Sequence, residues 1–470
     1  MRVGRLIDLA NVTVWRKMLK TGEMQEEPTL TVGVLEAPRF HLSLRGSYKV
    51  EGNGKAIGGP AFVRTEADGL ALETESGIVI NAKEVAVIPS EPHVASFVLN
   101  DVVIGKQFHW QRAENQRFRG GLRLVRTTSG NVAAINTVKL EDYLASVISS
   151  EMSGEGAAEF LKAHAIASRS WLIAQISKSR ELKAGGHSRP ESVQQETGRL
   201  IRWYDREDHE LFDVCADDHC QRYQGITRPL TAAVERAVHE TRGTVLMSKG
   251  MVCDARFSKC CGGVTERYDH VWEAVPHSYL TSVRDADSVD IPDLTAETGA
   301  AKWITSSPSA FCNVRDVNIL DKILPRLDRE TQDFFRWKVK YHQQEIAELI
   351  RQKSGIDFGG IKTLLPVRRG SSGRLEEMTI VGTKRSLTVG KELEIRRLLS
   401  ASHLFSSAFI VNTEGEHDGL PDVFTLSGAG WGHGVGLCQI GAGVMGERGY
   451  TSEQILAHYF AGATVRRLYD

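Results

Sequence analysis

The residue best placed for acid–base chemistry is Glu151, a glutamate at the end of an amphipathic stretch. Helical spacing over residues 140–151 puts one apolar stripe beside a second stripe formed by Tyr143, Val147 and Glu151. Burial disfavours the charged form of a carboxyl group, so a glutamate that ends an apolar face is able to hold a proton at neutral pH. Glu151 is therefore a candidate general acid, and the alternative is an ordinary helix-end residue that faces water.

A second group of reactive residues combines thiols and imidazole at short spacing. His209, Cys215 and Cys220 are spaced H-x5-C-x4-C, and Cys260 and Cys261 follow further along the chain. Thiolate and imidazole ligands suit tetrahedral Zn²⁺. A disulfide between one cysteine of each group, or free thiols, are the alternatives. If zinc is bound, a structural role is favoured, because acid–base chemistry at Glu151 needs no Lewis acid.

A third feature is a glycine-dense segment near the end of the sequence. Residues 428–443 contain seven glycines around His433 and Gln439. Glycine lowers the steric cost of sharp bends and of close approach to a ligand. There is no GxxxxGK[ST] motif and no β-α-β pattern followed by an acidic residue, so a nucleotide site is not predicted. His433 is a candidate binding residue, because its flanking glycines leave it uncovered.

These residues need elements that hold them in place, and the sequence predicts a helix–break–helix unit around Glu151. Residues 152–156, Met-Ser-Gly-Glu-Gly, interrupt the first helix. An alanine-rich stretch follows to about residue 176 and favours a second helix. Small side chains let two helices approach closely, which would place Glu151 at the elbow between them.

The whole chain reads as an α+β protein of several units, since 470 residues exceed the usual size of one domain. Residues 177–210 are polar and predict an exposed excursion, and residues 333–351 predict a long helix. The predicted units are a polar segment (1–30), a β-rich domain of antiparallel strands (31–130), a mixed core (131–295 and 361–470) and a helical insertion (296–360).

Charge and hydropathy exclude two classes of partner. The chain has 58 basic and 59 acidic residues and a formal charge of −1, which argues against binding to nucleic acid. No apolar run approaches the ~18 residues that a membrane span requires. The first residues show neither an apolar core nor a cleavage site of an export signal.

Six motifs, taken in order, give the chain its resemblance to the SpoIID/LytB domain family. The resemblance covers roughly residues 130–470, and the preceding residues do not share it. The motifs are LEDYLASVISSEM (140–152), LKAHAIASRSWLI (161–173), DVCADDHCQRYQG (213–225), AVHETRGTVL (237–246), FSKCCGGVTE (257–266) and GWGHGVGLCQIGA (430–442).

This resemblance implies work on peptidoglycan. Some members of the family resemble lytic transglycosylases, which cleave glycan strands between N-acetylmuramic acid and N-acetylglucosamine, and others enhance an N-acetylmuramoyl-L-alanine amidase. The essential acid of the catalytic members matches Glu151, and a zinc seen in some members would be held by His209, Cys215 and Cys220. The residues expected to contact substrate are Arg169, Ser170, Gln221, Tyr223, His433 and Gln439. For Arg169 an internal salt bridge is an equally good interpretation.

The function expected is therefore that of a lytic transglycosylase in which one glutamate acts first as acid and then as base. The C6 hydroxyl of the muramic acid attacks its own C1, so no second carboxylate is needed and a 1,6-anhydromuramyl end results. The alternatives are a non-catalytic enhancer of an amidase and a zinc-dependent hydrolase. The substrate places the protein in the cell envelope, outside the cytoplasm, although no export signal is visible.

Overall fold

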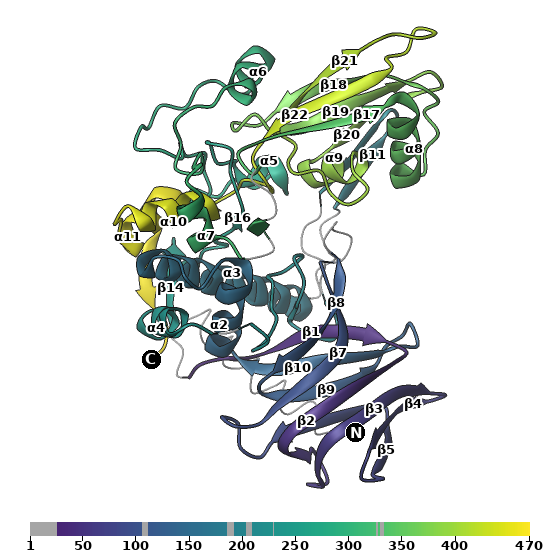
Figure 1. Cartoon of the computed structure of the whole chain (residues 1–470), viewed down its shortest axis with the longest axis vertical. Coiled ribbons are helices and arrows are strands. Elements are labelled where there is room, and N and C mark those ends of the chain that lie inside the picture. The colour runs from purple at the N-terminus through teal and green to yellow at the C-terminus, as the bar shows by residue number, and fades with distance from the viewer. Residues whose placement is uncertain are drawn as a thin grey trace.

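The computed structural model describes residues 26–105, 111–185, 192–203, 209–228, 230–325, 328–329 and 333–470. Its elements form three tiers along the long axis of the molecule (Figure 1): a large sheet of N-terminal strands, a layer of helices, and a group of smaller sheets. The predicted α+β class is confirmed. Most of the polar segment predicted over residues 1–30 lies outside the described residues.

The first tier is an eleven-stranded sheet in which only the short strand β13 runs parallel to its neighbour. Buried and exposed side chains alternate along β2, as expected of a strand with one face on a core. The predicted antiparallel strands are confirmed, but β10 lies between β1 and β9, so the sheet continues past the boundary predicted at residue 130. The strands are β1 (Thr29–Ala37), β2 (Arg39–Val50), β3 (Ala56–Glu66), β4 (Gly69–Thr74), β5 (Val79–Ala82), β6 (Glu84–Pro89), β7 (Ser96–Ile104), β8 (Arg112–Phe118), β9 (Gly121–Arg126), β10 (Val132–Lys139) and β13 (Val214–Cys215).

The middle tier holds the predicted helix–break–helix unit, which the structure confirms. Helix α2 is followed by a break and then by α3, against which α4, α10 and α11 pack. The first turn of α2 contains Glu141 and Asp142, where the helix dipole favours negative charge. In α3, Ala163, Ala165 and Ala167 are fully buried and allow neighbouring helices to approach closely. The helices are α2 (Leu140–Glu151), α3 (Ala158–Gly185), α4 (Ala232–Glu240), α10 (Gln439–Glu447) and α11 (Ser452–Tyr459).

The last segment of the sequence closes this tier. Strand β24 (Thr464–Arg467) pairs antiparallel with β14 (Thr244–Ser248), the strand that follows α4. Just beyond β24, the buried Tyr469 donates a hydrogen bond to the carboxylate of Glu141 in α2. Segments far apart in the sequence therefore meet at the start of the helix that ends in Glu151.

The third tier contains two further sheets, and it corrects two predictions. Residues 193–202, predicted as an exposed excursion, form two strands, of which β12 pairs with β20, while every residue of β11 is exposed as predicted. The helix predicted over residues 333–351 is wrong in its first half, where β17 pairs along its whole length with β22. One sheet contains β11 (Val193–Glu196), β12 (Arg199–Arg202), β20 (Ser386–Gly390), β19 (Leu375–Gly382) and β18 (Ile361–Arg369), and the other contains β17 (Arg336–His342), β22 (Val423–Ala429) and β21 (Phe409–Glu414).

The remaining elements connect the tiers. Helix α8 (Gln343–Ser354) follows β17 and is the part of the predicted long helix that the structure retains. None of the helices in the described ranges is both long and apolar enough to cross a membrane. The shorter elements are β15 (Met251–Val252), β16 (Phe257–Ser258), α5 (Tyr268–Val271), α6 (Glu297–Thr305), α7 (Val317–Ile323), α9 (Glu392–Leu398) and β23 (Leu437–Cys438).

Candidate functional site

Glu151 is the last residue of α2, and the packing of that helix fixes its position. Tyr143 and Val147 enter the core under the N-terminal sheet, while Ile148 and Met152 enter the core of the helical tier. A helix held from two sides leaves little freedom to its final residue. Glu151 is 8% exposed, so it lies largely covered at the elbow between α2 and α3.

The carboxylate of Glu151 is held from one side only. Its Oε1 accepts a hydrogen bond from the backbone N–H of Arg222 at 2.9 Å. The main-chain carbonyl of the same residue accepts a hydrogen bond from Nζ of Lys259 at 2.8 Å. Within the described residues, Oε2 of Glu151 accepts no hydrogen bond. One oxygen of this carboxyl group therefore remains for a ligand.

A network of buried charges surrounds Glu151. The guanidinium of Arg222 lies 2.5 Å from Asp218 and 3.6 Å from Asp328, and Nζ of Lys259 lies 2.7 Å from Asp328. Burial raises the pKa of Asp218, and the charge of Glu151 adds to this although Arg222 opposes it. Burial also acts to raise the pKa of Asp328, but Lys259 and Arg222 hold it below its usual value. The two cations therefore share an ionised partner, Asp328, and fix the surroundings of Glu151.

The loop that supplies Arg222 is anchored on the N-terminal sheet. Its short strand β13 pairs in parallel with β1, and the N–H of Ala216 donates to the carbonyl of Gly33 at 2.9 Å. A side chain at Gly33 would collide with the ring of Phe212, since an added Cβ would lie 2.3 Å from that ring. Glycine is thus required where the loop crosses the strand.

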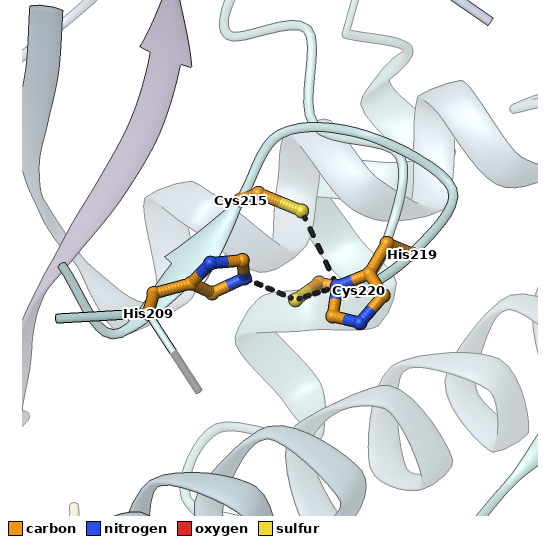
Figure 2. Close-up of side chains that lie close together, drawn as sticks. All are labelled: His209, Cys215, His219 and Cys220. Atoms are coloured by element: carbon orange, nitrogen blue, oxygen red, sulfur yellow. Dashed lines mark hydrogen bonds between the residues drawn. The ribbon is translucent and has the colours of Figure 1, made fainter. Parts of the chain in front are cut away.

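The same loop brings together four possible metal ligands, which Figure 2 shows converging: His209, Cys215, His219 and Cys220. The Sγ of Cys220 lies 3.5 Å from Nε2 of His209 and 3.5 Å from Nδ1 of His219. The Sγ of Cys215 lies 3.7 Å from the same Nδ1. Around a tetrahedral zinc, sulfur and nitrogen ligands lie about 3.5 Å apart, given Zn–S and Zn–N bonds of about 2.3 and 2.0–2.1 Å. The donor set therefore fits zinc.

The structure adds one residue to the predicted zinc ligands and, within the residues it describes, does not contain the disulfide that was the main alternative to zinc. His219, which was not among the predicted ligands, belongs to the group. Cys260 and Cys261 are buried elsewhere, and none of the seven cysteines, all within the described ranges, forms a disulfide. Hydrogen bonding to Cys220 lowers the pKa of the Cys215 thiol, which favours the thiolate form that binds metal.

Two residues expected to contact substrate, Arg169 and Ser170, lie inside the protein instead. The guanidinium of Arg169 is fully buried and makes a bidentate ion pair with Glu141, at 3.0 and 2.6 Å. The hydroxyl of Ser170 donates to the carbonyl of Ile166 and accepts from the N–H of Leu246. The internal salt bridge is thus the correct interpretation of Arg169, and both residues tie α3 to its neighbours.

Gln221 and Tyr223 also make contacts inside the protein. Gln221 is fully buried, and its amide donates to the carbonyl of Ser168 in α3. Tyr223 is stacked on Tyr143 with ring centroids 4.9 Å apart, and its hydroxyl donates to Oδ1 of Asn136 at 2.6 Å. These contacts hold the two sides of Arg222 in place, so both residues position the loop. Oε1 of Gln221 has no hydrogen-bond partner within the described residues, and its contact with substrate stays a prediction.

The glycine-dense segment explains the placement of His433 and Gln439. Gly430, Gly432 and two further glycines at alternate positions all have positive φ, a conformation that other residues rarely adopt. His433 is half-buried against the ring of Trp272, and burial lowers its pKa well below the usual value. Gln439 is buried and lies 3.3 Å from the imidazole of His164, which corrects its predicted contact with substrate. For His433 the contact stays a prediction.

Sequence reasoning missed the residues that surround Glu151 most closely: Asp218, Arg222, Lys259 and Asp328. Asp218, Arg222 and Lys259 fall within the motifs of the SpoIID/LytB resemblance. Each of these charged residues is close in sequence to a pair of cysteines, and that proximity could have identified them. The hydrogen bond to Glu151, however, comes from a main-chain N–H. Almost every residue type has a main-chain N–H, so the sequence does not show which residue will donate.

Comparison with known families identifies a SpoIID-type domain in the part of the chain that holds this site. Residues 128–247 match the family model described as "Stage II sporulation protein", and this range contains Glu151 and the loop with Cys215 and Cys220. This region of the chain therefore belongs to the SpoIID domain family. Residues 266–436 match a second family model, described as "Domain of unknown function (DUF8618)".

Three relatives illustrate this membership. The chain is 25% identical over 343 residues to stage II sporulation protein D of Bacillus amyloliquefaciens, covering 71% of this chain and 75% of that protein. It is 24% identical over 336 residues to the protein of the same name from Bacillus subtilis, covering 71% and 76%. It is 22% identical over 251 residues to the amidase enhancer of Bacillus subtilis, covering 49% and 32%. The chain is thus a distant homologue of both kinds of protein.

Proposed function

We propose that this protein is a peptidoglycan lytic transglycosylase of the cell envelope, with Glu151 as its catalytic acid and base. One observation carries the proposal: a largely buried glutamate at a helix elbow has one carboxyl oxygen held by the N–H of Arg222, while the other accepts no hydrogen bond in the described structure. A carboxyl group held in this way is oriented and still able to exchange a proton with a ligand.

The proposed reaction needs one such group. Glu151, protonated, gives its proton to the glycosidic oxygen as the bond from that oxygen to C1 of N-acetylmuramic acid breaks. The C6 hydroxyl of the same sugar bonds to C1, and Glu151 takes the hydroxyl proton, which restores the acid. No water is consumed, and the product is a 1,6-anhydromuramyl end. The buried cations Arg222 and Lys259 stay paired with Asp218 and Asp328 and keep the carboxyl group in position.

The loop that carries the possible zinc ligands supports this chemistry by holding the N–H of Arg222 in position. His209, Cys215 and Cys220, with His219 as a fourth ligand, would hold the ion, and a zinc ion bound there supplies a rigid cross-link within the loop. Cys220 lies two residues before Arg222, whose N–H bonds to Glu151. A loop held at Cys220 therefore fixes the donor that orients the acid.

The test is digestion of glycan strands stripped of stem peptides, followed by mass analysis of the ends. We expect wild type to release ends lighter by one water than hydrolysed ends, and Glu151→Gln to lower the rate by ~10²–10⁴-fold, the usual contribution of a general acid. Glu155→Gln is the matched control, because Glu155 is exposed and only four residues away. Equal rates for wild type and Glu151→Gln would refute the proposal.

A second candidate function rests on the similarity to the amidase enhancer. In that case the protein would bind the cell wall and stimulate an N-acetylmuramoyl-L-alanine amidase without cleaving glycan itself. Adding wild type and Glu151→Gln to such an amidase separates the two functions. Equal stimulation by both, with no anhydro ends from either, would favour the enhancer.

A third candidate, a zinc-dependent hydrolase, rests on the fit of the loop ligands to a metal. It predicts hydrolysed ends, loss of turnover on chelation, and full turnover of Glu151→Gln. The same digestion therefore distinguishes it by the mass of its products.

A further inference from the structure

Four buried side chains from separate parts of the chain converge in the middle of the molecule, away from the loop ligands: Cys261, Asp285, Cys312 and Cys438. One ligand atom of each lies within 4.8 Å of the others. All four residues are at most 2% exposed. The proposed cleavage reaction uses none of them, so their convergence needs another explanation.

The spacing of the sulfur atoms fits a metal and not a disulfide. The Sγ atoms of Cys261 and Cys312 are 3.7 Å apart. A disulfide requires about 2.05 Å. Two thiolates on one tetrahedral zinc, each at about 2.3 Å from the ion, lie about 3.8 Å apart. The pair therefore has the separation of two ligands that share an ion.

The carboxyl group of Asp285 is fully buried without a cationic partner in the described part of the chain. Its oxygens accept only uncharged donors: the hydroxyl of Tyr459 at 2.6 Å and the N–H of Cys312 at 2.8 Å. A buried carboxylate that lacks a counter-charge is strongly unfavourable. A metal ion among the three thiols would supply that charge.

Main-chain donors already orient the sulfur atoms. The N–H of Cys261 donates to Sγ of Cys438 at 3.2 Å, and the N–H of Gly263 donates to Sγ of Cys261 at 3.4 Å. Hydrogen bonds of this kind hold metal ligands in place and favour their charged form. The main chain thus holds the sulfur atoms of Cys438 and Cys261 in fixed positions.

Two arginines offset the charge that a filled site would carry. Three thiolates, one carboxylate and a divalent ion sum to a net charge of −2. Arg284 donates to the carbonyl of Gly263 at 2.8 Å, and Arg336 donates to the carbonyl of Gly262 at 3.1 Å. Both guanidinium groups therefore lie on the loop that carries Cys261.

We propose that Cys261, Asp285, Cys312 and Cys438 bind one zinc ion as a structural site, distinct from the loop ligands around Cys215. Three soft thiolates exclude magnesium and calcium, which prefer oxygen ligands, and favour zinc. Four protein ligands close the coordination shell, which is the mark of a structural ion.

The ion would join four segments that meet at the core of the helical tier. Cys438 precedes α10, Cys261 lies in the loop after β16, and Asp285 and Cys312 lie in the connections on either side of α6. Lys259, which bonds to the carbonyl of Glu151, is two residues before Cys261. The buried ion would therefore also fix the segment that holds the end of α2.

The test begins with the variant Cys215→Ser/Cys220→Ser, which removes the loop ligands and leaves the buried group intact. Metal analysis of this purified variant is expected to find one zinc per chain. After exchange with cobalt, the absorption spectrum should show thiolate-to-cobalt charge transfer and the d–d bands of a tetrahedral ion. Adding Cys312→Ser should remove the metal. The cobalt spectrum keeps the test valid even if that last variant does not fold.

Two results would overturn the proposal. One is a folded loop variant that contains no metal and whose five remaining cysteines all react as thiols after denaturation. The other is a disulfide between Cys261 and Cys312, seen as three reactive thiols in place of five and as the loss of two hydrogens in the intact mass. Neither result depends on whether the protein cleaves glycan.

Discussion

The two groups of metal-type ligands are separated by very different lengths of chain. The loop group lies within residues 209–220, and its members are half-buried or exposed. The buried group extends over residues 261–438 and is enclosed by protein on all sides. The first group can form once one loop has folded, whereas the second exists only after distant segments have packed into the core of the helical tier.

This difference has an energetic consequence. A cross-link stabilises a fold by removing chain entropy from the unfolded state, and the effect grows with the logarithm of the loop that it closes. For the two spans here the same law gives a difference of about 2 kcal/mol in favour of the buried group. The loop group is thus suited to fixing a local feature, the N–H of Arg222, and the buried group to stabilising the domain.

The largest effect is expected when the buried group is broken. Cys312→Ala should lower the free energy of unfolding by more than about 4 kcal/mol, because it removes an ion that joins four segments. Denaturant-induced unfolding measures this. Cys253→Ala is the matched control, since Cys253 is also buried but belongs to neither group. Equal losses in the two variants would show that only packing is involved.

Release of metal should separate the two groups next. We expect a chelator to remove zinc from the loop group at least on the order of 100-fold faster than from the buried group, because the latter opens only by large-scale unfolding. A zinc-sensitive dye should then report two phases in wild type. Only the slow phase should remain in Cys215→Ser/Cys220→Ser. A single fast phase in wild type would contradict the predicted difference in the rate of zinc release between the two groups.

A third prediction concerns the link between the groups, Lys259. Lys259→Met removes the bonds to the carbonyl of Glu151 and to Asp328. We expect cleavage to slow by about 10–100-fold, since small displacements of a catalytic group have effects of this size, while both ions stay bound. Lys322→Met removes an exposed ion pair with Glu447 and should change nothing. Loss of metal from the Lys259 variant would mean that the position of Glu151 and the binding of the ions cannot be altered independently.

The smallest effect is expected for His219, the exposed member of the loop group. His219→Ala leaves His209, Cys215 and Cys220, and zinc is stable with three protein ligands and water. The free energy of unfolding should therefore change by no more than about 0.5 kcal/mol, and metal analysis should still find the loop ion. Complete loss of that ion would make His219 an essential ligand.

The sequence predicted the elements near Glu151 well because local signals agree there. The spacing of apolar residues, the glycines after Met152 and the following alanines all favour the same helix–break–helix unit, which the structure contains. The error at residues 336–342 has a physical cause. Trp337, Val339 and Tyr341 alternate as in a strand, and pairing with β22 overrides the helical spacing.

The candidate site was less predictable, for two reasons. Polar residues in motifs, such as Arg169 and Tyr223, satisfy buried partners, and sequence alone does not distinguish this from contact with substrate. The buried metal ligands have no fixed spacing, because only the tertiary fold brings them together. Short spacing, in contrast, made His209, Cys215 and Cys220 recognisable.

The hydrogen bond between Tyr469 and Glu141, together with the pairing of β24 with β14, bears on how the protein is made. During translation, α2 and its buried ion pair with Arg169 leave the ribosome long before residue 469 does. The helix that carries Glu151 therefore completes its contacts only after residue 469 has been synthesised. Until then, the nascent chain exposes apolar surface of the kind that promotes aggregation, and Glu151 is not yet in its final position.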